Sequence, residues 1–430
     1  IANRQHSLSL QQNLMSTYED IMDWLMTQLP MFQRQGSANY KIDLRKTQAL
    51  MAYLDHPERA FKSIHVAGSN GKGSTSHIMA SILQAEGLKV GLSTSPHMID
   101  FRERIKLNGD MIPKSYVTAF VHDHRAAFES MSLSFFEMAT GLAFCYFRDV
   151  QVDVAIIEVG MGGRLDSSNV IQPEISVITN ISLDHQAFLG NDISSIASEK
   201  AGIIKAGIPV VIGRRQTETT EVFLAKSQAC GSDILWAEDL KVQGLSLPDC
   251  DLQGHYQREN LLTAVAALTL QKTWPVSDTS MVYGAAHVAS STGLMGRWQI
   301  LQQQPYVVAD AAHNADGLRV SMAQWKSVMA GYDTGIMVIG VVNDKDVEHM
   351  LSLLPPSANL IFCAPSIPRA MPAKALAEIA TRCGRPGTCS GTVAAAYELA
   401  LQQADAKSCI YVGGSSFVVA DCLEHLAEQA

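Results

Sequence analysis

A glycine-rich turn between an apolar run and a helical pattern constrains this chain more than any other stretch. Residues 62–94 read KSIHVAGSNGKGSTSHIMASILQAEGLKVGLST. The apolar residues at 64–67 predict a strand, those at helical spacing from Ile78 predict a helix, and the residues after them predict a second strand. The glycines let successive N–H groups converge on one anion, beside the positive end of the helix dipole. The stretch therefore predicts a phosphate-binding loop in an α/β fold.

The loop departs from the common phosphate-binding spacing. Only Ser69 and Asn70 separate Gly68 from Gly71, where the common loop has about four residues before Gly-Lys. An ordinary strand-to-helix turn is therefore the structural alternative. A lysine here can reach the outer phosphates of a nucleotide, and a hydroxyl after it can meet magnesium. The predicted ATP contacts in the loop are Ser69, Asn70, Gly71, Lys72, Gly73 and Ser74.

Composition limits the partners of the chain. A length of 430 residues predicts two domains, and 47% hydrophobic with 17% charged residues predicts well-packed ones. The net charge of −9 argues against a nucleic-acid surface. The eight cysteines form no Cys-x-x-Cys pair, and neither a membrane-spanning run nor a signal-peptide pattern is present. We expect a cytoplasmic protein, a monomer, with no nucleic-acid or membrane partner.

GSNGKGST followed by STSPHMIDFRERI resembles the folylpolyglutamate synthase and dihydrofolate synthase family of bacterial bifunctional type. That family belongs to the Mur ligase superfamily of ATP-dependent amide-forming enzymes, and the resemblance covers nearly the whole chain. It implies a mostly parallel-sheet ATPase domain over residues 1–295 and a smaller Rossmann-like α/β domain, the glutamate ligase domain, over 296–430. The segment GLMGRWQI marks the joint between them.

Three side chains at predicted strand ends are candidate magnesium ligands. Glu158 interrupts an apolar run near its end, and a buried carboxylate is costly unless it is paired or bound to metal. Ser95 and His185 also follow apolar strands. A turn cap explains Ser95 about as well, and a lone histidine at such a place is more often a satisfied loop residue, but the three residues together favour metal ligands. Since ligands of doubly wound sheets bind beyond the strand ends, we expect all three beside the phosphate loop.

Lys200 lies on the apolar side of a predicted helix, with Ile196, Ile203 and Ile204 near it. An apolar setting lowers the pKa of a lysine and favours the nucleophilic, neutral amine. In the family that it resembles, the matching lysine is carbamylated by carbon dioxide and helps to hold a second magnesium ion. The resemblance therefore implies a carbamylated Lys200 and two magnesium ions.

Three segments are implied to bind the pterin ring. Serine and glutamate at 134 and 137 also form the pattern of a helix capping box, and an aromatic residue between them is more often core. The loop ending at 44 and the turn after Gly-Gly-Arg likewise have structural alternatives, a packed loop and a turn salt bridge. The implied pterin residues are Leu44, Ser134, Phe135, Phe136, Glu137, Leu165, Asp166 and Ser167.

Beyond residue 254 the resemblance implies four nucleotide contacts. They are Asn260 at adenine, Arg297 at the phosphates, Asp310 at the ribose and His313 nearby. Asn260 reads equally well as a polar residue at a helix start. The segment VNDKDV, with its charges at 344–346, also fits the family, and a solvated turn explains it as well. FRERI, at 101–105, predicts a strand with a charged exposed face.

These predictions combine into one reaction. ATP phosphorylates a substrate acid, and the amine of L-glutamate displaces phosphate from the acyl phosphate to form an amide. Lys72, His185, Lys200 and Arg297 are the implied catalytic residues. The acid would be dihydropteroate, and folates as well. Two alternatives remain open, a peptidoglycan-precursor ligase of the same superfamily and a nucleotide-binding protein without ligase activity.

Overall fold

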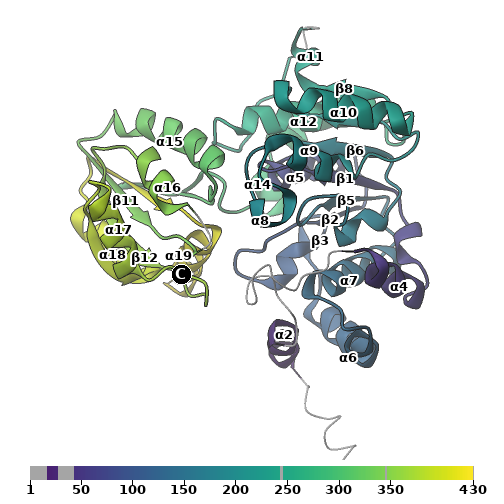
Figure 1. The fold of residues 1–430 in the computed structure, drawn as a ribbon, viewed down its shortest axis with the longest axis horizontal. Helices are drawn as coiled ribbons and strands as arrows, with labels where there is room; N and C mark the ends of the chain where they lie inside the picture. Colours follow the sequence, from purple (N-terminus) through teal and green to yellow (C-terminus); the bar gives the residue numbers. More distant parts are fainter. Residues whose placement is uncertain (1–16, 28–42, 243–245, 344–345, 430) are drawn as a thin grey trace, which may run out of the picture.

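The computed structural model describes residues 17–27, 43–242, 246–343 and 346–429, which form two α/β units (Figure 1). The larger unit is built on an eight-stranded sheet of order β4-β3-β2-β5-β1-β6-β7-β8. β2, β5, β1, β6, β7 and β8 pair in parallel, whereas β3 and β4 add an antiparallel edge. The strands are β1 (Ser63–Ala67), β2 (Val90–Ser93), β3 (Ile105–Leu107), β4 (Asp110–Met111), β5 (Val154–Glu158), β6 (Ile175–Ile178), β7 (Val210–Ile212) and β8 (Ile234–Trp236).

Helices cover both faces of this sheet because its central strands are apolar on both sides. In β5, Val154 and Ile156 pack with α5 and α12, while Ala155 and Ile157 pack with α4 and α7 on the other face. The helices of this unit are α2 (Tyr18–Thr27), α4 (Arg45–Tyr53), η2 (Pro57–Arg59), α5 (Lys72–Ala85), η3 (Phe101–Arg104), α6 (Lys114–Met131), α7 (Phe135–Asp149), η4 (Ser167–Val170), α8 (Gln186–Leu189), α9 (Ile193–Ala201), α10 (Thr217–Cys230), α11 (Ala237–Val242), α12 (Gln257–Leu270), α13 (Asp278–Ala285) and α14 (Val288–Thr292).

The smaller unit has a six-stranded sheet of order β13-β12-β11-β14-β10-β9, parallel except for β9. α15, α16 and α17 cover one face, and α18 and α19 cover the other. The elements are β9 (Gln299–Gln303), β10 (Tyr306–Asp310), α15 (Ala315–Met329), β11 (Thr334–Ile339), α16 (Val347–Leu353), β12 (Asn359–Ala364), α17 (Ala373–Arg382), β13 (Thr388–Thr392), α18 (Val393–Gln403), β14 (Ser408–Gly413) and α19 (Ser416–Gln429). The expected α/β class is confirmed.

The strand predicted at 101–105 is wrong. Phe101–Arg104 forms the 3₁₀ helix η3, and β3 begins only at Ile105. The reason is a capping box, in which Asp100 accepts from the N–H of Arg102 while Glu103 accepts from the N–H of Asp100. Residues 28–42, in the loop that ends at Leu44, and residues 344–345 of the segment VNDKDV lie outside the described residues.

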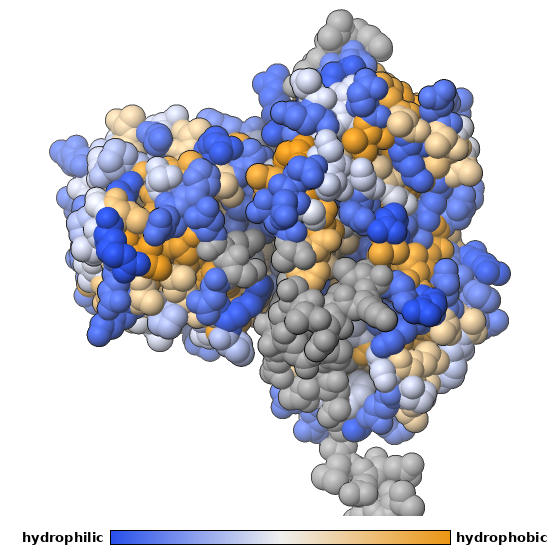
Figure 2. All heavy atoms as spheres, in the orientation of Figure 1, coloured by the Kyte–Doolittle hydropathy of each residue, from blue (hydrophilic) through white to orange (hydrophobic). Residues whose placement is uncertain are grey.

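The surface in Figure 2 is mainly hydrophilic, with smaller hydrophobic areas on both units. Every helix in the described ranges is too short or too polar to cross a membrane. Buried Lys106 of β3 donates to the carbonyl groups of Thr292 and Gly293 at the end of α14, which ties the last helix of the larger unit to its sheet.

Candidate active site

The predicted phosphate loop connects β1 to α5, with Lys72 as the first residue of the helix. Gly71 has φ +84°, and a Cβ atom there would lie 2.2 Å from Asn260 Oδ1. Only glycine combines this conformation with such a close approach. The Ser69 hydroxyl donates to the Ser182 carbonyl, and Asn70 N–H donates to Asn180 Oδ1 at 3.0 Å. Side chains from the segment after β6 therefore fix the loop.

The side chain of Lys72 folds back over the loop. Its Nζ donates to the carbonyl oxygens of Gly68 and Ser69 at 3.1 and 3.3 Å. The ammonium group therefore lies above the loop, at the positive end of α5, where helix geometry leaves the first N–H groups without intrahelical acceptors. A phosphate group could exchange with these carbonyl contacts without moving the helix.

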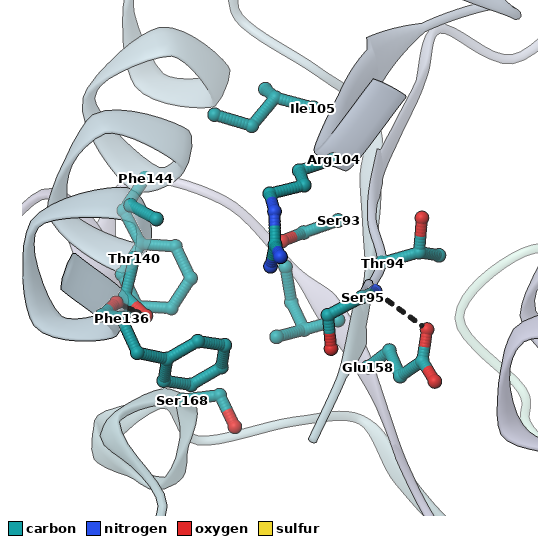
Figure 3. Close-up of a pocket in the computed structure, with 12 residues that line it drawn as sticks. Ser93, Thr94, Ser95, Arg104, Ile105, Phe136, Thr140, Phe144, Glu158 and Ser168 are labelled. Carbon is teal, nitrogen blue, oxygen red and sulfur yellow. Dashed lines mark hydrogen bonds between the residues drawn. The ribbon is translucent and has the colours of Figure 1, made fainter. Parts of the chain in front are cut away.

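Glu158 ends β5 as predicted, and it is only 5% exposed. Its Oε2 accepts a hydrogen bond from Ser95 N–H at 3.0 Å (Figure 3). Burial raises the pKa of Glu158, and the charges of Lys72, Arg297 and Arg104 partly oppose that shift. The structure thus gathers three cations from separate segments around one buried carboxylate next to the phosphate loop.

The residues near Glu158 suit a hard divalent cation. The Ser95 hydroxyl and the Glu158 carboxylate are oxygen ligands, and Mg²⁺ binds through one or two carboxylates while keeping waters and substrate phosphates. No group of three or more His, Cys, Asp or Glu side chains that could hold a metal occurs in the described part of the chain. Most ligands of a magnesium ion here would therefore come from phosphate and water.

Lys200 is 4% exposed on α9, and its setting matches the sequence prediction. Burial and the charge of Lys72 lower its pKa to about 7, against opposing effects of Asp184 and Asp166. Asp184 is buried and its Oδ2 lies 3.6 Å from Nε2 of His185, which has φ +50°. The structure therefore places Lys200 near Lys72, and His185 beside a carboxylate.

A pocket lies between α7 and the ends of β2 and β5 (Figure 3). Phe136 and Thr140 of α7 line one side, and Ser95 and Glu158 line the other. The Arg104 side chain points between them. This pocket touches both the implied pterin segment and the carboxylate beside the phosphate loop.

Arg104 is a pocket residue that the sequence prediction missed. Its Nε donates to His97 Nδ1 at 2.7 Å, and its guanidinium lies 5.1 Å from the ring centroid of Phe135. Burial lowers the pKa of Arg104 to about 10, an effect that Glu158 opposes. The alternating FRERI pattern gave no signal for this role because the inward direction depends on η3.

The implied pterin residues have mixed surroundings. Ser134 and Glu137 form the predicted capping box, with Ser134 N–H donating to Glu137 Oε2 at 2.7 Å. Phe135 is 7% exposed and belongs to the core, whereas Phe136 lines the pocket. Leu44 is partly buried at the start of α4. Of these residues, Phe136 alone is among the pocket-lining set.

Leu165 and Asp166 form the turn that leads into η4, and Ser167 is the first residue of η4. Asp166 is 6% exposed and caps η4, since its Oδ1 accepts from Ser168 N–H at 3.0 Å and its Oδ2 accepts from Met161 N–H at 2.9 Å. Arg164 pairs with Glu199 at 2.8 Å, so the salt bridge of this turn does not involve Asp166. A pterin contact by Asp166 would use the acceptor capacity left after these bonds.

The smaller unit contributes polar residues that lie close to the phosphate loop and Glu158. Asp310 is 1% exposed, and its Oδ2 accepts from the Tyr256 hydroxyl at 2.6 Å and from Trp298 N–H. The charge of Arg297 lowers the pKa of both Asp310 in the smaller unit and Glu158 in the larger one. His313 Nδ1 lies 3.0 Å from the Ala311 carbonyl oxygen, immediately after β10. The implied nucleotide contacts of both units thus surround one joint.

Sequence profiles of two known domains match the chain. Residues 66–268 match the Mur ligase middle domain, and residues 296–416 match the Mur ligase glutamate ligase domain. Together with the fold and the loop, these matches define a ligase of the Mur type.

Curated relatives narrow this class. The chain is 34% identical over 430 residues to a probable bifunctional folylpolyglutamate synthase/dihydropteroate synthase of Haloferax volcanii, covering 90% of this chain but only 49% of that protein. It is 35% identical to the folylpolyglutamate synthase of Lacticaseibacillus casei, covering 77% and 83%. With the dihydrofolate synthase/folylpolyglutamate synthase of Bacillus subtilis it shares 34% identity, covering 84% and 89%. The chain belongs to the folylpolyglutamate synthase/dihydrofolate synthase family.

Solved structures agree over nearly the full chain. Escherichia coli FolC in complex with DHPP and ADP superposes with a TM-score of 0.84 and 29% identity, covering 96% of this chain and 98% of that one. A bifunctional folylpolyglutamate synthase/dihydrofolate synthase with Mn, AMPPNP and L-glutamate bound gives a TM-score of 0.82 and 28% identity, with the same coverage. The two-unit fold is therefore the fold of the family.

Proposed function

We propose that this protein is an ATP-dependent ligase that joins L-glutamate to dihydropteroate and to folates. The observation that carries the proposal is the position of Glu158, buried among Lys72, Arg297 and Arg104 beside the phosphate loop. Such a site can hold a triphosphate with its metal against an acid in the adjoining pocket. Family membership and the ligands bound in the solved relatives support the choice of substrates.

The reaction has two displacements. A carboxylate oxygen of the pteridine acid attacks the γ-phosphorus of ATP, and the bond to the β,γ-bridging oxygen breaks, releasing ADP and an acyl phosphate. The amine of L-glutamate then attacks the acyl carbon, loses a proton, and the C–O bond breaks to release phosphate. An acid cannot readily expel oxide or water, so the phosphate provides the leaving group.

The residues of the site stabilise the charge of the transferred phosphoryl group and position the substrates. Lys72 and Arg297 offset the charge that develops on the transferred phosphoryl group, and preorganised cations of this kind dominate such catalysis. Ser95 and Glu158 would hold a magnesium ion, with His185 as a further ligand, and a bound magnesium would neutralise phosphate charge. Contacts across the joint keep the two units together, which limits access of water to the acyl phosphate.

The proposal includes a carbamate on Lys200. A neutral amine attacks the carbon of carbon dioxide, loses one proton, and becomes a carboxylate-bearing group that would hold a second magnesium ion. The pKa of Lys200, about 7, supports this because a large part of the amine is neutral near that pH. A well-resolved density map that shows a bare ammonium group at Lys200 would rule the carbamate out.

The remaining assignments extend this proposal to the ligands. Asn260 contacts adenine and lies against Gly71 of the loop, Asp310 at the end of β10 contacts the ribose, and His313 lies nearby. Phe136 stacks on the pterin in the pocket of Figure 3. Asp166 accepts a hydrogen bond from the ring. We propose that the protein acts as a cytoplasmic monomer without nucleic-acid or membrane partners.

One incubation tests the function. Protein, ATP, magnesium and labelled L-glutamate are mixed with dihydropteroate or with tetrahydrofolate, and Lys72→Ala serves as the control. Label in both products would support both activities, and label in the pteroate product alone would restrict the enzyme to dihydrofolate synthesis. Label in neither product would contradict the proposal and reopen the nucleotide-binding alternative. A UDP-sugar precursor in parallel would reveal a peptidoglycan ligase.

A further inference from the structure

A buried hydrogen-bond chain connects the strand before the phosphate loop to the turn before η4. His65 of β1 is 0% exposed, and its Nε2 lies 2.9 Å from the hydroxyl oxygen of Ser168. That hydroxyl donates to Asp166 Oδ1 at 2.5 Å. None of the steps proposed above uses His65 or Ser168, although both are completely or almost completely buried.

The direction of each bond in the chain follows from its chemistry. An ionised Asp166 carboxylate can only accept, so the single hydroxyl proton of Ser168 points to it. Ser168 must then accept from His65, which places the ring proton on Nε2. Burial lowers the pKa of His65 to about 3, so the ring is neutral and Nδ1 carries a lone pair. In the described part of the chain, Nδ1 has no hydrogen-bond partner.

The hydrogen-bond chain fixes the orientation of the Asp166 carboxylate. Its Oδ1 accepts from both the N–H and the hydroxyl of Ser168, which fills its two lone pairs. Its Oδ2 accepts from Met161 N–H at 2.9 Å, and a hydrogen bond from Gly160 N–H to the carboxylate also lowers the pKa of Asp166. Without the donation from Ser168, the carboxylate could rotate between these donors.

The hydrogen-bond chain from His65 to Asp166 lies next to the pocket, which it reaches at Ser168. Ser168 lines the pocket next to Phe136, and Figure 3 shows its hydroxyl pointing away from the pocket, below the ring of Phe136. His65 pairs with Ile157 of β5 and Ser176 of β6, in the centre of the sheet. His65 is therefore anchored in the most rigid layer of the molecule while Ser168 reaches the pocket lining.

We propose that His65 is a positioning residue for the pteridine substrate, which it serves through Ser168 by fixing the orientation of the Asp166 carboxylate. This inference rests on the proposed function and deepens it. His65 is 0% exposed, so it would not contact ATP or the acid directly. We expect it to affect substrate affinity alone, because it acts only through Ser168 and Asp166.

Variants of His65 and Ser168, the first two links of the hydrogen-bond chain, test the inference in the intact protein. His65→Met and Ser168→Ala each remove one link, whereas His65→Gln keeps an amide N–H near the position of Nε2. Loss of a hydrogen bond that orients a charged group corresponds to about a tenfold rise in the Kd and KM for dihydropteroate. The KM for ATP changes less than about twofold, and His65→Gln restores most of the affinity.

The double variant separates positioning from general packing. If His65 acts through Ser168, adding His65→Met to Ser168→Ala produces no further rise in the KM for dihydropteroate. Ser176→Ala is the matched control, since this serine is also fully buried beside β1 and donates to the Ile203 carbonyl instead. It should lower thermal stability to a similar degree without changing that KM.

The outcomes distinguish this inference from the proposed function. Ligase activity with an unchanged dihydropteroate KM in Ser168→Ala, or additive effects in the double variant, would overturn the role of His65. If His65→Met does not fold, Ser168→Ala and His65→Gln still decide the matter. A wild-type protein that joins glutamate to no pteridine acid would refute the function, and equilibrium titration with dihydropteroate would still report whether the chain controls binding.

Discussion

Asn314 Nδ2 donates a hydrogen bond of 2.8 Å to Oδ1 of Asn70, which joins the smaller unit directly to the phosphate loop. The same Asn70 side chain donates through Nδ2 to the Ser182 hydroxyl. Asn314 also caps α15, because its Oδ1 accepts from Gly317 N–H at 2.8 Å. One asparagine therefore starts a helix in one unit and orients the loop of the other.

The two roles of Asn314 can be separated by substitution. Asn314→Ser keeps a capping oxygen but loses the amide donor, so we expect a severalfold rise in the KM for ATP with stability within about 0.5 kcal/mol of wild type. Asn314→Ala loses the cap as well and should cost about 1 kcal/mol more. Steady-state kinetics and urea unfolding measure the two effects, and an unchanged ATP KM in Asn314→Ser would contradict the role of the contact.

A substitution of Glu158 should also lower activity without lowering the stability of the fold. In Glu158→Gln the amide oxygen can still accept from Ser95 N–H, but the negative charge among Lys72, Arg104 and Arg297 is lost. We expect turnover at a fixed magnesium concentration to fall by about 100-fold or more, because a charged metal ligand and a preorganised charge disappear together.

A magnesium titration of the variant checks this prediction. The apparent affinity for the metal should weaken together with turnover, while far-UV circular dichroism stays unchanged. Glu58→Gln is the control, since Glu58 is also a mostly buried carboxylate but pairs with His56, away from the site. An equal loss of activity in both variants would mean that Glu158 acts through packing and not through the metal.

The sequence predicted those parts of the site that depend on short spacing. The loop, the start of α5 at Lys72, the position of Glu158 at the end of β5 and the burial of Lys200 all follow from local periodicity and strand ends. Such features can be predicted without knowing any distant contacts, because the pattern of apolar and polar residues repeats within one helix or strand.

Residues whose roles depend on distant contacts were not predicted. Arg104 points into the pocket because η3 replaces the expected strand, and its neighbour Phe135 lies on a different helix. Tyr256 meets Asp310 only when the two units come together. β13, with the sequence TCSGT, is an edge strand that carries no apolar run, so periodicity gave no indication of it.

Lys200 links stability to pH in the absence of carbon dioxide. Its pKa is about 7 in the folded protein and 10.5 in an unfolded chain, so between these values the unfolded chain binds more protons. The free energy of unfolding should therefore rise with pH through this window, and below about pH 7 the whole cost of burying the charged amine applies. Lys200→Met removes this dependence and should stabilise the protein at pH 7 by a few kcal/mol.

Urea unfolding in bicarbonate-free buffer at pH 7 and pH 9 measures the difference. Wild type should gain stability relative to Lys200→Met as the pH rises, and Lys407→Met, an exposed position, should behave like wild type. Adding bicarbonate should change the stability and raise the activity of wild type, but not of Lys200→Met, because only a free amine can form the carbamate. An identical pH dependence in wild type and Lys200→Met would mean that the lysine stays charged when buried, which would also remove the chemical basis for its carbamylation.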